Sequence, residues 1–188
     1  RCWGYDAGER RWDWFFTGLK GESYEGRMAR LGGWQLEPAG QEFLHREYQM
    51  LLANALAQAQ ARAGRKTVLW GRSAGTAETI NTTRQNPDYL PGVTFDVAIE
   101  ATTDAKTALE GATLILAVVP AQTLRDVLRS LEAFVPEGVP IVLCAKGIER
   151  SSGKLMSAVV ADCLSGNPAA ALSGPSFAID VARGLPTA

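Results

Sequence analysis

Short apolar runs alternate with longer segments of helical character from about Leu51 to the end of the chain. The apolar runs, which predict strands, are residues 67–70, 97–101, 113–119, 141–144 and 169–172. The intervening segments, which predict helices, are residues 51–63, 73–84, 103–110, 121–134, 153–164 and 176–183. Strands that alternate with helices of this length form βαβ units around a parallel sheet. The pattern therefore predicts an α/β fold with a doubly wound parallel sheet.

Residues 1–50 differ in kind from the rest of the chain. They contain no Val and no Ile but carry four of the five tryptophans, and their apolar residues keep neither helical nor strand period for long. We predict a poorly ordered head over 1–50, apart from a helix that begins near Pro38, and a nucleotide-binding type of domain over 51–188. Within that domain, turn residues predict a loop over 86–92, and Thr102 or Thr103 is expected to cap the helix that follows.

Composition excludes several classes of partner. The 188 residues carry a net charge of −1, which gives no bulk attraction for nucleic acid or for membranes. No apolar run approaches the roughly 20 residues of a membrane span. The cysteines, Cys2, Cys144 and Cys163, lack metal-ligand spacing, and two of them sit in apolar runs where a small hydrophobe would serve. We expect a reduced, cytoplasmic setting and no metal site.

Lys146 follows the predicted strand at residues 141–144. In open parallel α/β sheets, ligands bind in the crevice outside the carboxyl ends of the strands. A cation at that point would face an anionic substrate or cofactor. The alternative is a lysine that merely returns the chain to solvent, and strand spacing alone does not separate these two interpretations.

Two further strand ends carry candidate binding residues. Arg72 follows the strand at 67–70, where an arginine in a dinucleotide-binding fold can accommodate the 2′-phosphate of NADP. Gly174 and Ser176 lie in the turn after the strand at 169–172, where freed N–H groups and a hydroxyl suit a small anion or hydroxyl. An ordinary surface arginine and an ordinary helix cap are the alternatives. A glycine-rich phosphate loop is not found before Leu51.

Six ordered segments over about residues 52–188 closely resemble the N-terminal domain of the bacterial type of NAD(P)-dependent glycerol-3-phosphate dehydrogenase, which has a Rossmann-like fold. They are residues 68–72, 86–93, 117–122, 145–149, 173–178 and 182–188. The resemblance implies hydride transfer between NAD(P)H and dihydroxyacetone phosphate or sn-glycerol 3-phosphate, in glycerophospholipid synthesis. It leaves NAD against NADP open, and for a full-length enzyme it leaves a homodimer open.

The resemblance also implies roles for particular residues. It assigns the position of Lys146 to both substrate and cofactor, those of Gly174 and Ser176 to the substrate, and those of Arg72 and Ala178 to the cofactor. It assigns no catalytic residue to this chain, because the general-acid lysine of the family belongs to a C-terminal helical domain.

Two departures from the family pattern limit what we expect of the chain. The head at 1–50 stands in place of the family's first strand and glycine-rich loop, so the sheet is expected to be incomplete, and the C-terminal helical domain does not follow residue 188. We therefore expect little turnover by this chain alone. The alternatives are a non-catalytic, truncated remnant, or another dehydrogenase of the 2-dehydropantoate reductase or 6-phosphogluconate dehydrogenase type.

Overall fold

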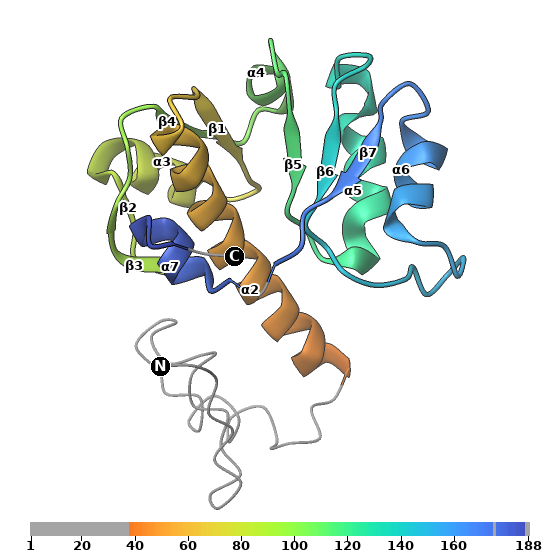
Figure 1. Ribbon diagram of the computed structural model, residues 1–188, viewed down its shortest axis with the longest axis horizontal. Coiled ribbons are helices and arrows are strands. Elements are labelled where there is room, and N and C mark those ends of the chain that lie inside the picture. Colours follow the sequence, from red (N-terminus) through yellow and green to blue (C-terminus); the bar gives the residue numbers. More distant parts are fainter. Residues whose placement is uncertain (1–37, 175, 187–188) are drawn as a thin grey trace, which may run out of the picture.

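Parallel strands form the middle of the molecule in the computed structural model, and helices lie on their faces (Figure 1). The structure describes residues 38–174 and 176–186, and side chains from residue 48 onward. The helices are α2 (Pro38–Arg62), α3 (Ala74–Thr83), α4 (Ala105–Leu109), α5 (Leu124–Leu131), α6 (Met156–Cys163) and α7 (Ala178–Arg183), with 3₁₀ turns η2 (Ala121–Thr123) and η3 (Glu132–Phe134) at the ends of α5. The strands are β1 (Thr67–Trp70), β2 (Gln85–Asn86), β3 (Leu90–Thr94), β4 (Ile99–Thr102), β5 (Ile115–Ala117), β6 (Ile141–Leu143) and β7 (Ala169–Ala171).

The parallel strands form two separate sheets. β1 pairs with β4, and β5, β6 and β7 pair in that order, with β6 in the centre. In the strand order 3-2-1-4-5-6 of a doubly wound fold, β4 and β1 correspond to strands 3 and 2, and β5, β6 and β7 correspond to strands 4, 5 and 6. Strand 1 of that order would lie between β1 and β5. No strand in the described part of the chain pairs with the facing edges of β1 and β5. The predicted α/β class is thus confirmed.

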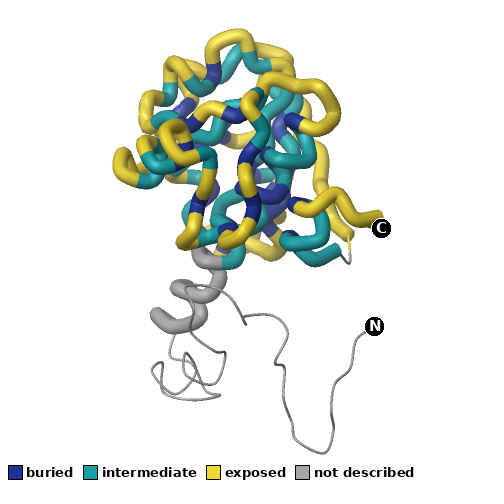
Figure 2. Tube along the Cα trace, turned by 90° about the vertical axis from the view of Figure 1, so that its left-hand side faces the viewer, coloured by how far each residue is buried: buried dark blue, intermediate teal, exposed yellow. Residues whose placement is uncertain are grey.

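The hydrophobic interior is divided in the same way. The first core gathers buried residues of α2, α3, β3, β4 and α7, including Ile80, Leu90 and Ile99, and the half-buried Leu69 of β1 packs against it. The second gathers residues of β5, α5, β6 and α6, including Leu124 and Ile141. Buried positions are interspersed with half-buried and exposed ones along the chain (Figure 2), and in β4 the buried Ile99 and Ala101 flank the exposed Glu100. Each half of the sheet therefore has its own packed interior.

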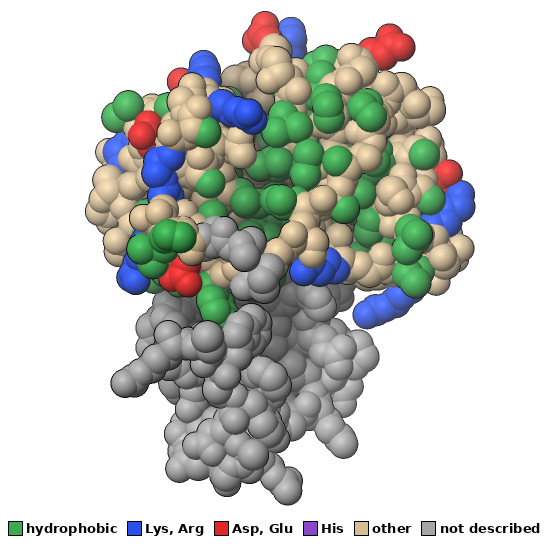
Figure 3. Space-filling view, viewed as in Figure 1, with side chains coloured by type: hydrophobic (Ala, Val, Ile, Leu, Met, Phe, Trp, Pro, Cys, Tyr) green, Lys and Arg blue, Asp and Glu red, His purple; other side chains and the backbone are tan. Residues whose placement is uncertain are grey.

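The uncovered edges leave apolar surface between the two halves. Ile115 and Leu116 of β5 are half-buried, as are the four residues of β1. Hydrophobic side chains gather over the middle of this face (Figure 3). The run at 113–119 predicted a strand covered on both sides. The observed strand is shorter and less buried, because among the described residues β5 has a partner strand only on the side of β6.

Helix α2 starts at Pro38, as the sequence predicted, and runs unbroken for 25 residues. It therefore crosses position 50/51, which the sequence suggested as the boundary between head and domain. Residues 1–37 of the head lie outside the described residues. The helix is followed by Gly64, at φ 76°, and its C-terminal half packs against β1 and α7. None of the described helices is long and apolar enough to cross a membrane.

Two local predictions were wrong. Of the segment 86–92, expected as a loop, only residues 87–89 form a turn, and this turn joins β2 and β3 in an antiparallel hairpin. The cap of α4 is Asp104, whose carboxylate accepts a hydrogen bond from the amide of Thr107 at 2.9 Å. Thr102 instead uses its hydroxyl to accept from the amide of Asp104. A carboxylate is a strong acceptor for the amides of a first helical turn, which explains the choice of cap.

Candidate functional site

The carboxyl ends of three parallel strands form one edge of the larger sheet. Ala117, Leu143 and Ala171 lie side by side in the register of β5, β6 and β7. Lys146 and Gly174 each follow this row by three residues, so the two loops leave the sheet at the same edge. Because such edges bind ligands in open α/β sheets, this is the candidate functional site.

Lys146 stands exposed at the point where its strand leaves the interior. The preceding residues, Cys144 and Ala145, are 5% and 9% exposed. The amide of Cys144 donates to the carbonyl of Ala117 at 3.2 Å, which extends the pairing with β5 beyond the strand. Gly147, the next residue, has φ 133° and lies against Ala121, and this backbone conformation favours glycine. The backbone before the lysine is therefore fixed by pairing with β5, and a turn at Gly147 follows it.

The surroundings of Cys144 are apolar. Burial raises the pKa of its thiol to about 11, so the thiol stays protonated at neutral pH. Cys163 is also free and buried. Both cysteines are therefore packing residues, as the sequence indicated, rather than nucleophiles. No group of three or more metal-ligating side chains exists among residues that the structure describes.

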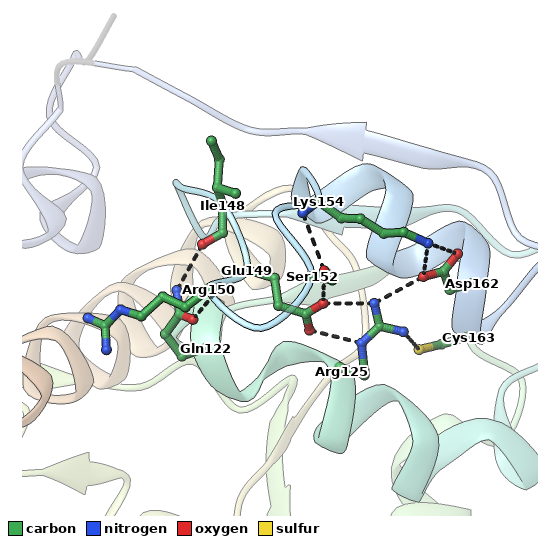
Figure 4. A network of polar contacts seen from close by, with 9 residues as sticks. All are labelled: Gln122, Arg125, Ile148, Glu149, Arg150, Ser152, Lys154, Asp162 and Cys163. Atoms are coloured by element: carbon green, nitrogen blue, oxygen red, sulfur yellow. Dashed lines mark hydrogen bonds and ion pairs between the residues drawn. The ribbon is translucent and has the colours of Figure 1, made fainter.

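The loop after Lys146 is held by a network of polar contacts (Figure 4). The contacts join Gln122, Arg125, Ile148, Glu149, Arg150, Ser152, Lys154, Asp162 and Cys163. The Arg125 guanidinium forms two parallel hydrogen bonds to the Glu149 carboxylate, of 2.9 and 2.8 Å. These bonds, with the hydroxyl of Ser152, hold the pKa of Glu149 at about 2. The network is thus ionised across the physiological pH range.

Arg72 follows β1 in the other half of the sheet and is exposed. Next to it, Ser73 caps α3, accepting from the amide of Thr76 at 3.2 Å. A hollow of about 280 Å³ opens here, lined by Ser73, Gly75, Thr76, Thr79, Asn86, Pro87 and Asp88. An arginine beside hydroxyls and a helix N-terminus fits a phosphate group. The residues therefore suit the ribose-phosphate end of a dinucleotide, whereas the described residues hold no glycine-rich loop for its pyrophosphate.

The turn after β7 connects the two halves of the protein. Gly174 is exposed, Ser176 is half-buried, and the chain then enters α7, which packs on α2 in the first core. Ala178 is 3% exposed and belongs to that core. Its side chain is therefore a packing group, so a cofactor contact at this position would have to use the backbone.

The sequence did not identify the network around Glu149. Arg125 belongs to α5, and its side chain is 18% exposed and paired with Glu149. Its partner lies 24 residues away, and helical periodicity carries no information on such a pair. Glu149 lies in one of the six segments that carry the resemblance, but Arg125 lies in none of them, so the sequence carried no signal for the pair.

A family model described as the NAD-dependent glycerol-3-phosphate dehydrogenase N-terminus matches residues 53–188. Curated relatives named glycerol-3-phosphate dehydrogenase, NAD(P)+, include one from Mesorhizobium japonicum, 56% identical over 134 residues, and one from Chelativorans sp., 53% identical over 134 residues. Each alignment covers 71% of this chain, but only 39% and 41% of the two relatives. The chain thus spans about two fifths of the length of the relatives it matches.

Solved structures give the same result. The glycerol-3-phosphate dehydrogenase of Coxiella burnetii superposes with a TM-score of 0.68 at 35% identity, covering 73% of this chain and 42% of that one. The yeast enzyme superposes with a TM-score of 0.61 at 26% identity, with the same coverage. The family model covers most of the chain, and the fold agrees with it. The chain therefore belongs to the NAD-dependent glycerol-3-phosphate dehydrogenase family, of which it represents the N-terminal part.

Proposed function

We propose that the protein to which this chain belongs interconverts dihydroxyacetone phosphate and sn-glycerol 3-phosphate with NAD(P)H, as a step toward glycerophospholipids. In this proposal the chain supplies the cofactor side of the active site and part of the substrate side. The observation that carries the proposal is the exposed Lys146 at the carboxyl end of β6, in register with the turn that holds Gly174. The names of the curated relatives support the reaction.

Lys146 would act on the charge that develops during the reaction. The nicotinamide cofactor, when bound, supplies or accepts a hydride. Reduction of a ketone places negative charge on its oxygen, and a cation fixed nearby stabilises that charge. Lys146 has a firm backbone on both sides, so its ammonium can be presented without reorganisation. Gly174 and Ser176 would bind the substrate at the neighbouring strand end.

The cofactor would meet the chain at two further positions. Arg72, beside the hollow at the start of α3, suits the 2′-phosphate of NADP or the ribose of NAD. The backbone of Ala178 would line the cofactor on the other side. The proposal includes a homodimeric full-length enzyme and a cytoplasmic setting. The free, buried thiols of Cys144 and Cys163 fit a reducing compartment.

A second candidate is a non-catalytic remnant of such an enzyme. The observation in its favour is the split sheet, because the edges of β1 and β5 face each other without a pairing strand in the described chain. Such a remnant would fold around its two cores but would not assemble a site for the whole dinucleotide.

A chimera tests whether residues 53–188 keep the groups that the reaction needs. Residues 53–188 would replace the matching part of the Mesorhizobium japonicum relative, and oxidation of NADH and NADPH would be followed with dihydroxyacetone phosphate. The proposal predicts substrate-dependent oxidation by the chimera. A chimera that folds and binds NADPH but does not oxidise it would reject the proposal and favour the remnant.

The matched variant in that chimera is Lys146→Ala. Loss of one group that stabilises an oxyanion costs about 100- to 1,000-fold in kcat. A comparable loss is expected here, whereas Lys106→Ala, at an exposed position of α4, removes an equal charge from outside the site. Unchanged turnover in Lys146→Ala would remove this lysine from the active site.

A further inference from the structure

Gln122 holds the backbone just beyond Lys146 at two points. Its side-chain amide donates to the carbonyl of Ile148 at 3.0 Å, and its carbonyl oxygen accepts from the amide of Arg150 at 3.0 Å. Both bonds reach 26 to 28 residues along the chain, from the turn that precedes α5 to the loop after β6. The Gln122 side chain therefore bridges two points of the loop and holds the loop at a fixed distance from α5.

Arg125, one helical turn further on, holds the residue between those two points. Its guanidinium binds the Glu149 carboxylate through two nitrogen atoms, and the Glu149 side chain is only 6% exposed. A bidentate pair of this kind fixes orientation as well as distance. Gln122 and Arg125, named here the α5 clamp, thus grip three consecutive residues of the loop.

The clamp is itself braced from the neighbouring helix. Arg125 also contacts Asp162 of α6 at 3.0 Å, and Lys154 binds the same carboxylate at 2.9 and 2.7 Å. The Ser152 hydroxyl donates to Glu149. Within the loop, the amide of Glu149 donates to the carbonyl of Lys154 at 2.9 Å. The polar groups that face Glu149 from α5, α6 and its own loop are therefore all engaged.

We propose that Gln122 and Arg125 are positioning residues for Lys146: by gripping residues 148–150 they hold the loop so that the lysine stands at the carboxyl edge of the sheet. The proposal rests on the proposed function for the role of the lysine, but the ordering of the loop does not depend on it. Pairing with β5 fixes the loop before the lysine, and the α5 clamp fixes it afterwards. Gly147 alone would leave this second side free to swing.

Amide hydrogen exchange on the full chain tests the ordering. Arg125→Met should raise the exchange rate of the Arg150 amide about tenfold, although Arg125 does not touch that amide. Arg125→Lys, which keeps the charge but not the bidentate grip, should give an intermediate rate. Arg129→Met removes the same charge from an exposed position one turn later and should leave the rate unchanged. Equal rates in the parent, Arg125→Met and Arg125→Lys would overturn the proposal.

Kinetics in the chimera test the consequence for Lys146. Arg125→Met should lower kcat by about 10- to 100-fold, since small displacements of a catalytic group have such effects, while KM for NADPH changes little. Partial recovery in Arg125→Lys would support the proposal. A loosened loop with unchanged kcat would overturn it. An inactive parent chimera would count against the proposed function, and the exchange rates would then decide the ordering of the loop by themselves.

Discussion

The side-chain amide of Asn86 donates to the side-chain oxygen of Asn54 at 3.1 Å inside the first core. Both residues are 2% exposed. Asn54 in turn donates to the carbonyl of Met50 at 2.6 Å, one turn earlier in α2. This chain of bonds ties the long helix to the hairpin of β2 and β3, which lines the hollow beside Arg72.

Replacing Asn54 by Leu should destabilise the protein. The change leaves the buried amide of Asn86 without its acceptor, which costs about 1 to 3 kcal/mol. The free energy of unfolding, measured with urea, should fall by that amount. In the double variant Asn54→Leu/Asn86→Leu, removal of both partners should recover part of the loss. Strict additivity of the two single changes would show that the pair does not interact.

Glu149 makes the stability of the protein depend on acid pH. Its pKa is about 2 in the folded protein, below the ordinary value of 4.5. The pair with Arg125 therefore stabilises the fold fully above pH 4.5, and that contribution is lost as the pH falls toward 2. Glu149→Gln should show a flatter fall in stability over this range in thermal melts. Parallel curves for the parent and Glu149→Gln would contradict the role of the pair.

Gly184 ends α7 with φ 73°, where its α-carbon lies against the guanidinium of Arg62. Arg62 donates to the carbonyls of Val181 and Ala182, and so joins α2 to α7. Gly184→Ala should destabilise by roughly 1 to 2 kcal/mol through its left-handed backbone alone, and the added methyl would also displace Arg62.

The matched control for this variant is Gly75→Ala. Gly75 lies in helix α3 with open space around its α-carbon, and alanine there should stabilise by about 0.5 to 1 kcal/mol. Thermal melts should thus shift in opposite directions for the two glycines. Equal shifts in the same direction would contradict the geometry at Gly184.

The open edge of β1 should be visible in amide exchange. The amide of Thr67 donates to Ala98, just before β4, and that of Gly71 donates to Thr102 of β4, so alternation along the strand turns the amides of Val68 and Trp70 toward the other edge. We expect Val68 and Trp70 to exchange at least about tenfold faster than Leu69. Equal protection of the three amides would mean that a further strand covers this edge in solution.

The main elements followed from the sequence where local pattern decides structure. The strand predicted over 141–144 is found as β6, which ends before Lys146 as expected, because a buried strand cannot hold a charge in its middle. The hairpin over 86–92 was missed, since Pro91 and Gly92 are turn residues by type but lie within β3. On this edge strand neither residue is required to complete a ladder on both sides.

The contacts that order the candidate site did not follow from the sequence. Arg125 and Glu149 are far apart in the chain, and only the packing of α5 against the loop after β6 brings them together. Burial of the pair depends on α6 as well, through Asp162. Contacts between residues far apart in the chain leave no periodic pattern in the sequence. The ends of apolar runs, by contrast, mark the strand ends that precede Lys146 and Arg72.

Perturbation of backbone amides by NADPH in the isotope-labelled chain tests the central claim most directly. The account predicts shifts at Arg72, Lys146 and Ala178, the positions that it assigns to the cofactor. It also predicts a smaller shift at Arg72 with NADH, which lacks the 2′-phosphate. Shifts confined to the opposite ends of the strands, or no shifts at millimolar NADPH, would contradict it.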